Sequence, residues 1–300
     1  MKHLFTTLAC CLSFGICVAQ TDTTATPVLS VDSTTSLQTT LPAAAAVTPA
    51  SPAAQAMDTE VFRKNGVKMN LSSLAFSNYS FSYERAIARK ITLVGGYSIL
   101  PDSKAGDIPL IKKGIELAEI DSETGDNTEG EDITEILDNA NVSSNAITGE
   151  IRFYTGKKPG ARGFYASLYG RYTTMNLSHT YVYEADAGQD IDVPIVAKLN
   201  GFGGGVMLGA QWLIAKRVTF DWYIVGGHYG KLTGDLTGKT DLRALSQEEK
   251  ADLEAEIEDI ASNGDRKYID ATVNDNGMFG KVNSPFGGIR GLGFNIGIAF

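Results

Sequence analysis

Cysteine is scarce in this chain of 300 residues: only Cys10, Cys11 and Cys17 occur, all close to the start. Without its first 19 residues the chain has no thiol, which excludes disulfides and cysteine metal sites. Long apolar runs are scarce as well. No stretch of about 18 apolar residues follows Val18, so we expect no transmembrane helix. The formal net charge of -9 argues against a nucleic-acid partner.

The first 19 residues have the pattern of an export signal. Residues 1–3 (MKH) give a basic start, residues 4–18 are apolar, and residues 17–19 (CVA) form a small-residue cleavage site. The sequence TLAC at residues 7–10 is a poor lipoprotein signal, because it lacks the usual leucine and comes too early. We therefore predict that residues 1–19 are a signal peptide.

The next segment is poor in large apolar side chains. From Thr21 to Ala56 the chain is almost entirely Thr, Ser, Ala, Pro and Val. Such a segment cannot bury enough apolar surface to offset the entropy lost on ordering. We predict that residues 20–60 are a disordered tether in the periplasm.

Residues 61–300 show a different pattern, in which apolar side chains recur at every second position. Runs of this kind, near the nine to eleven residues that a tilted strand needs to cross a membrane, predict strands. The eight runs are about 67–76, 79–88, 91–99, 146–155, 163–173, 203–214, 218–230 and 291–300.

The connections between these runs alternate in length. Short links lie at residues 89–90, 156–162 and 215–217, and long links at 101–145, 176–197 and 232–290. The link at 77–78 is also short, where the alternation allows a long one. Short turns on one rim and long loops on the other are typical of a membrane-spanning meander.

Each run has one face of large apolar side chains and one face of small or polar side chains. In the last run, Phe294, Ile296 and Ile298 share a face, and Asn295 and Gly297 share the other. The interior of an eight-stranded barrel has little room, so the bulky face would overpack it. We therefore expect the bulky face to lie outside, against lipid. A soluble β-sandwich with these side chains in its core is the alternative.

The last strand also carries a family resemblance. It ends in Phe300 with apolar residues at every second place before it, and the motifs YER at 83–85 and DWY at 221–223 accompany it. Over residues 61–300 the chain resembles the small bacterial outer-membrane β-barrel superfamily. That resemblance implies an outer-membrane location, recognition of the last strand by the barrel-assembly machinery, and a fold without a defined activity.

Together these patterns predict an all-β fold: an eight-stranded antiparallel up-and-down transmembrane β-barrel with short helices in the long outer loops. Ser246 and Glu249 form a capping box, and apolar residues follow at helical spacing. We predict a helix from about Gln247 to Ala261 and a shorter one over 132–139. The apolar stripe of the longer helix could cap the outer mouth or offer a surface to a partner.

Several charged residues fall on the inward face. Isolated charges there would be very costly, so we expect them to pair and to plug the lumen; a proton or ion path, or a gate, is the alternative. Four aromatic residues near the short-turn rim are predicted to form a girdle at the lipid boundary. The lumen cluster is Lys68, Glu84, Glu150, Arg152, Arg171 and Asp221, and the girdle is Phe153, Trp212, Phe220 and Phe300.

Little in the sequence indicates chemistry. His179 lies in an expected loop, and parity places His228 on the lipid side; neither has the spacing of a catalytic triad with a serine. We assign no catalytic, cofactor-binding or metal-binding residue. The acidic segment 121–132 lacks the ligand order of an EF-hand, although loose binding of divalent cations or of an extracellular protein at the acidic loops stays open.

The expected function is therefore a structural or interaction role for an integral protein of the outer membrane. The basic short turns would face anionic head groups of outer-membrane lipids. A narrow or gated pore for small solutes or ions is the first alternative. A lipid-modifying enzyme of the outer membrane is the second, and a periplasmic ligand-binding barrel is the third.

Overall fold

The computed structural model describes residues 62–113, 139–184, 190–263 and 266–300, which all belong to one compact unit. This part of the chain is mostly antiparallel β-sheet. The expected signal peptide (1–19) and tether (20–60), the acidic segment 121–132 and nearly all of the expected helix 132–139 lie outside the described residues. Within them, no helix is both long enough and apolar enough to cross a membrane.

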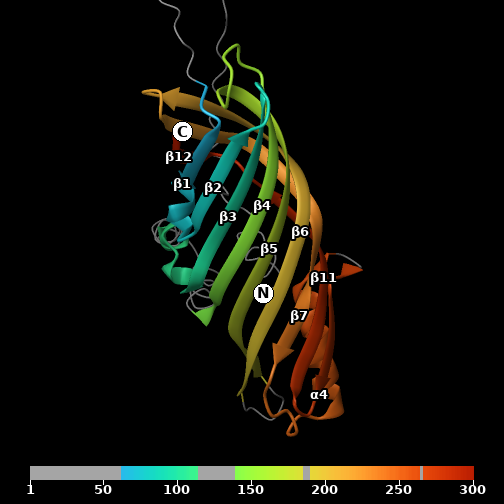
Figure 1. The fold of residues 1–300 in the computed structure, drawn as a ribbon. Coiled ribbons are helices and arrows are strands. Elements are labelled where there is room, and N and C mark those ends of the chain that lie inside the picture. The colour runs from blue at the N-terminus through green and yellow to red at the C-terminus, as the bar shows by residue number, and fades with distance from the viewer. Residues whose placement is uncertain (1–61, 114–138, 185–189, 264–265) are drawn as a thin grey trace, which may run out of the picture. The chain divides into compact units, whose positions relative to one another are not determined.

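Eight strands close into a ring in which each strand pairs with its neighbours, and the last pairs with the first (Figure 1). All pairings are antiparallel. The strands, in ring order, are β1 (Asn65–Asn70), β2 (Tyr79–Ala86), β3 (Ile91–Lys104), β4 (Asn141–Tyr154), β5 (Gly163–Glu184), β6 (Asp190–Ile214), β7 (Val218–Gly238) and β12 (Gly293–Ala299). The sequence therefore predicted each of the eight ring strands and their order.

The ring is uneven in height. β1 and β12 share only five residue pairs, whereas β5 and β6 share 22. The first predicted run, 67–76, is a strand only as far as Asn70, and its second half is the 3-10 helix η1 (Ser72–Phe76). Ser77 ends η1 in the left-handed conformation with φ 54°. The prediction was wrong here because Ser73 bonds back to Asn70, which turns the chain away from β12.

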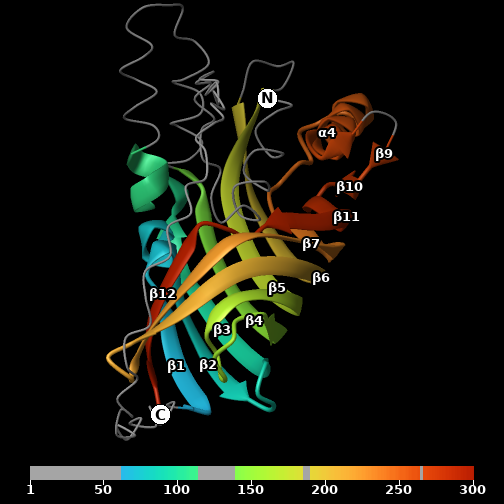
Figure 2. The ribbon, with the colours of Figure 1, turned by 90° about the horizontal axis from the view of Figure 1, so that it is seen from above.

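One edge of β7 carries two strands in succession. β12 pairs with residues 218–223 of β7, and β11 (Gly277–Ile289) pairs with residues 227–238. Beyond β11 the sheet continues to β10 (Ile269–Asn274). Figure 2 shows β12 running beside β1 toward the C-terminus, whereas β11 lies with β10 and α4 (Gln247–Ile260).

The segments 176–197 and 232–290, predicted as long loops, are largely regular structure. Residues 176–184 and 190–197 continue β5 and β6, and the second segment contains the end of β7, α4, β10 and β11. The helix predicted at 247–261 is confirmed as α4, with the capping box between Ser246 and Glu249. The remaining short elements are η2 (Ala105–Asp107), β8 (Ser262–Asn263) and β9 (Arg266–Lys267).

The apolar face changes sides along the long strands, and β6 shows this most clearly. Between Phe202 and Ile214 most of the large apolar side chains point outward, and Met207 is a buried exception. Between Asp192 and Asn200 the same outward parity carries mainly polar or charged side chains, and Val193 and Ile195 are buried on the inner face. Side chains still alternate between the two faces of β6 here, but the apolar ones now lie on the inner face. A search for outward apolar residues therefore ends near Phe202.

The inverted part of the sheet is covered by α4. Leu253 and Ile257 of the helix pack with Val193, Leu236 and Met278 into an apolar core. The stripe of α4 is therefore buried against the strands, which answers the question that the sequence left open. Figure 1 shows α4 at one end of the long strands and the C-terminus at the other; we call these the distal and proximal ends.

The helix also covers the edge of the sheet. Glu254 and Glu258, four residues apart on α4, accept hydrogen bonds from the backbone amides of Val273 and Ala271 in β10 at 3.0 and 3.2 Å. An edge strand with free amides is a template for pairing with other chains. The two carboxylates therefore block the outermost strand.

Candidate functional site

A cluster of charged side chains fills the ring between β1, β2, β4 and β7. Five of the six charged residues predicted to line the interior meet here: Lys68, Glu84, Glu150, Arg152 and Asp221. Each is at most 4% exposed. They meet because each occupies an inward position of its strand, and register brings these positions to a similar height.

Lys68 joins three strands. Its ammonium donates to Glu84 Oε2 at 2.6 Å, to Asp221 Oδ2 at 2.7 Å and to Gln211 Oε1 at 2.7 Å. All three donor positions of the ammonium are thereby used. The partners come from β2, β6 and β7, so one side chain links opposite sides of the ring.

Arg152 completes the cluster from β4. It donates to Asp221 Oδ2 at 2.6 Å and to Glu150 Oε1 at 2.8 Å. Its guanidinium carbon lies 4.5 Å from the centre of the Tyr165 ring and 5.5 Å from that of Tyr223. Planar stacking with several hydrogen bonds is the geometry that suits arginine better than lysine.

Neutral partners complete the network, and the sequence analysis missed them. Tyr154 donates to Glu84 at 2.8 Å, Tyr165 donates to Asp221 at 2.8 Å, and Thr92 donates to Glu84 at 2.5 Å. Their inward parity was visible in the sequence. However, only charged residues were considered there, although buried carboxylates need hydrogen bonds as well as counter-ions.

Arg290 approaches the same cluster from the link between β11 and β12. Its Nη1 lies 3.7 Å from Glu150 Oε2, and its guanidinium carbon lies 4.6 Å from the centre of the Tyr223 ring. With Arg290 included, three cations face three carboxylates. The sequence did not indicate this residue, because it lies at the end of a segment predicted to be a loop.

The structure separates Arg171, the sixth predicted residue, from this network. Arg171 extends from β5 on the distal side and donates to Thr173 Oγ1 at 3.2 Å. Within the described ranges it makes no ion pair, and Arg290 is its main charged neighbour. The prediction that all six charges pair is wrong for this residue.

Cavities border the cluster on several sides, and a small one of about 20 Å³ includes Glu150 in its wall. The distal one, of about 190 Å³, has Arg171, Arg290 and His228 in its wall, and the proximal one, of about 20 Å³, borders Lys68 and Glu84. None of the three acids of the cluster lines the larger cavity. The buried network therefore lies between the distal and the proximal cavity.

The prediction that His228 lies on the outward, lipid-facing side of its strand is wrong, and a β-bulge explains why. Leu208 of β6 faces Val225, but the next residue, Gly209, faces Tyr223, so Ile224 is an extra residue in β7. A bulge of this kind reverses the faces of all later residues. His228 therefore points into the distal cavity, where its Nδ1 lies 3.2 Å from the Tyr169 hydroxyl.

His179 lies elsewhere, within β5 rather than in a loop. Across the described ranges, neither histidine forms a hydrogen bond with a serine, and no group of three or more His, Asp or Glu side chains has the arrangement of a metal site.

The four predicted girdle residues lie on the outside of the ring, near the proximal turns. Phe153, Trp212 and Phe300 are exposed and Phe220 is half-buried. Trp212 contacts Phe220 with ring centres 5.8 Å apart, and Phe220 stacks on Phe294 at the same distance.

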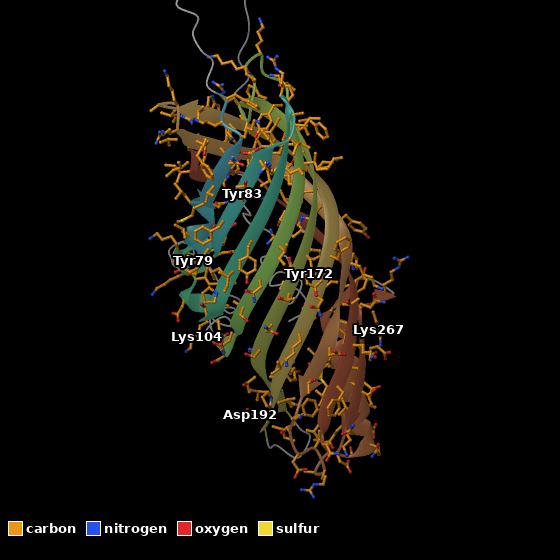
Figure 3. All side chains as sticks on the ribbon, viewed as in Figure 1. Tyr79, Tyr83, Lys104, Tyr172, Asp192 and Lys267 are labelled. Atoms are coloured by element: carbon orange, nitrogen blue, oxygen red, sulfur yellow. The ribbon has the colours of Figure 1, made fainter. Side chains whose placement is uncertain are left out.

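A second set of outward aromatic side chains lies further along the strands, and the sequence analysis did not name it. Figure 3 shows Tyr79 and Tyr172 on the outer face, and Tyr97 and Tyr229 are exposed there as well. The Tyr172 hydroxyl donates to Asn200 Oδ1 at 3.0 Å. These tyrosines lie where the outward face changes from apolar to polar.

Comparison with known proteins gives no further guide to function. No model of a known protein family matches the chain, and no curated protein is significantly similar to it.

Proposed function

We propose that this protein is an integral β-barrel of a bacterial outer membrane with a structural or interaction role. The observation that carries the proposal is the inversion of polarity along β5, β6 and β7. Large apolar side chains cover the outside of the ring on the proximal side, and a polar exterior with an apolar interior follows on the distal side. A strand that passes from lipid into water needs this change.

The apolar exterior is too extensive for a surface in water. A monomeric soluble protein rarely exposes a contiguous apolar patch above a few hundred Å². Here exposed side chains such as Leu93, Ile147, Leu168, Leu208 and Ile296 come from different strands around the ring. The interior of the ring holds the ion pairs. A soluble protein has the reverse distribution, with apolar side chains inside and charged ones outside.

The height of the apolar exterior fits a bilayer. On β6 it runs from Phe202 to Ile214. Twelve residue steps at about 3.3 Å span roughly 40 Å along the strand, or about 30 Å along the normal at a tilt of about 40°. The hydrocarbon core of a bilayer is about 30 Å thick. The two sets of aromatic side chains would then lie at its two boundaries.

The buried cluster supports a closed barrel rather than a pore. Lys68, Arg152 and Asp221 are bonded across the ring and have almost no exposed surface. The distal part of the sheet with α4 would project beyond the membrane and present polar surface to partners. For the pore alternative, planar-bilayer recording should give no steady conductance; a stable channel in the unaltered protein would favour the pore.

A matched pair of substitutions tests the membrane assignment. Leu208 and Val196 lie on β6, both outward and both exposed, but only Leu208 lies in the apolar band. Leu208→Arg should lower the free energy of unfolding in lipid vesicles by about 2–4 kcal/mol, because arginine is costly at the bilayer midplane. Val196→Arg should have little effect, because it would remain in water.

A soluble protein would tolerate both substitutions equally, since both side chains would face water. Equal, small effects would therefore overturn the proposal. So would a full-length protein that is monodisperse in plain buffer without detergent, with Trp212 and Trp222 unaffected by brominated lipids. We expect these lipids to quench the tryptophan fluorescence, because both side chains lie on the outer face.

A further inference from the structure

The distal cavity has hydrogen-bond donors without acceptors at one end. Arg290 Nη1 and His228 Nε2 are buried and have no hydrogen-bond partner among the described residues, since Glu150 Oε2 lies 3.7 Å from Nη1, beyond hydrogen-bond distance. Arg171 uses its Nε on Thr173. The Tyr169 hydroxyl lies 3.2 Å from Nδ1 of His228, and in the tautomer in which this hydroxyl donates, Nε2 carries the proton and is a donor. Buried donors normally have partners, so this end of the cavity is built to receive an acceptor.

The charge balance favours the same ligand chemistry. Lys68, Arg152, Arg171 and Arg290 give four positive charges inside the ring, and Glu84, Glu150 and Asp221 give three negative charges. The excess positive charge is at the cavity, because Arg171 is the cation without a carboxylate partner in the described part of the ring. One anion there would balance the interior.

The donors are held in place. The guanidinium of Arg290 lies over two rings, 4.6 Å from the centre of Tyr223 and 5.3 Å from that of Tyr169. The His228 ring packs on Phe286 with centres 4.9 Å apart. Groups fixed in this way lose little entropy when a ligand binds.

The rest of the cavity wall is mixed: Ser, Thr and Asn side chains such as Ser80, Ser98 and Asn78 lie beside a continuous apolar part. Leu100, Ile108 and Val142 form one buried cluster beside it, and Met175 and Phe286 belong to another. A small inorganic anion would leave this part of the wall without contacts. A ligand with an acidic group and an apolar tail would use both.

We propose that the distal cavity binds a single organic anion that consists of a carboxylate or phosphate group and a short aliphatic tail. The acidic group accepts hydrogen bonds from Arg171, Arg290 and His228, and the tail packs on the apolar wall. A dry cavity of about 150 Å³ is known to hold benzene. The cavity of about 190 Å³ is therefore suited to an acidic group with a tail of about six carbons.

The cavity borders the short side of the ring. Its wall includes Asn70, Ser72 and Gly293, where Ser72 Oγ accepts from the Phe294 amide at 2.9 Å and β1 ends. Beyond this contact β11 has β7 and β10 as neighbours and no pairing with β1. The acidic group and its tail could thus belong to a free solute or to the end of a longer lipid.

Direct titration of the full-length protein in a neutral detergent tests the proposal. Hexanoate should bind with a stoichiometry of one, at least tenfold more tightly than acetate, 1-hexanol or hexylammonium. Arg171→Gln and Arg290→Gln should each weaken hexanoate binding at least tenfold. Arg85→Gln, which removes an exposed arginine on the outside of β2, should leave it unchanged.

Dodecanoate separates the two sources of ligand. Binding of hexanoate alone would support a free solute, whereas binding of both acids would support a lipid that enters between η1 and β11. Equal affinity for hexanoate and hexylammonium, or unchanged binding in both arginine variants, would overturn the proposal. The apparent size of each variant on unheated and heated gels reports folding independently, so a failure of this site is distinguishable from a failure of the barrel assignment.

Discussion

Arg152 donates a 2.6 Å hydrogen bond to the carboxylate of Asp221, which lies 69 positions later in the chain. The same oxygen of Asp221 also accepts a 2.7 Å hydrogen bond from Lys68. One carboxylate therefore holds two buried cations that would otherwise repel each other. Much of the stability of the ring interior depends on it.

Removal of this negative charge should be costly. Asp221→Asn keeps the shape but leaves Lys68 and Arg152 close together without enough counter-charge. We expect the free energy of unfolding in vesicles to fall by about 3–5 kcal/mol, as for other buried pairs that lose one partner. Asp235→Asn is the control, because Asp235 is exposed on the same strand. Equal urea midpoints for the two variants would contradict the role assigned to Asp221.

Two glycines on the ring should respond very differently to alanine. A Cβ at Gly209 would lie 2.4 Å from Tyr165 and 2.7 Å from the carbonyl oxygen of Trp222, whereas a Cβ at Gly149 would have no atom within 4 Å. Gly209→Ala should lower the free energy of unfolding by about 1–3 kcal/mol through overpacking. Gly149→Ala should be close to neutral. Refolding yield and urea midpoints measure both, and a neutral Gly209→Ala would show that the bulge beside it can relax.

Weakening the apolar contact of α4 should detach the helix and leave the ring strands folded. Leu253 is fully buried in the distal core. Leu253→Ala should destabilise the attachment of the helix by about 2–5 kcal/mol through the cavity that it leaves. Limited proteolysis should then cut within residues 247–260 while the ring strands stay intact. Glu256→Ala, an exposed change on the same helix, should leave the cleavage pattern unchanged.

Acid should release the edge strand from α4. The Lys267 ammonium donates to Glu258 at 2.6 Å and, together with the Ala271 amide, holds the pKa of the Glu258 carboxyl below its ordinary value. The stabilisation is therefore present above the ordinary pKa of 4.5 and is lost as pH falls through the lower folded value. The hydrogen-exchange protection factor of the Ala271 amide should decrease below about pH 4.

Glu258→Gln is the control for this pH effect. Glutamine keeps an acceptor for the Ala271 amide but cannot titrate, so the acid-dependent loss of protection at Ala271 should disappear. High salt should weaken the link in the unaltered protein, because Lys267 is largely exposed. An unchanged acid response in Glu258→Gln would assign the effect to another group.

The sequence predicts the proximal half of the ring better than the distal half, for physical reasons. Runs such as 203–214 can be recognised in the sequence because the same face of the strand is apolar along the whole run. Residues 190–197 of β6 were predicted as loop because their apolar side chains lie on the opposite face. β11 contains four glycines and a proline, which weaken the alternating pattern, and its longer pairing is with β7, far from it in the sequence.

The site follows the same logic. Charged residues on inward positions of neighbouring strands were enough to identify Lys68, Glu84 and Asp221 as a group. The position of His228 was not accessible, because one extra residue at Ile224 reverses every later side chain of β7. A bulge depends on pairing with another strand, and a period counted along a single strand cannot detect it.

The five residue pairs between β1 and β12 have a mechanical consequence. β1 pairs with β2 through five residues as well, so it is held by five residue pairs on each side, whereas every other pairing between consecutive ring strands has at least six. Mechanical force or thermal motion should therefore separate β1 from one of its two neighbours before any other ring strands come apart. The strand that closes the ring is thus also the ring strand with the weakest attachment to the rest of the sheet.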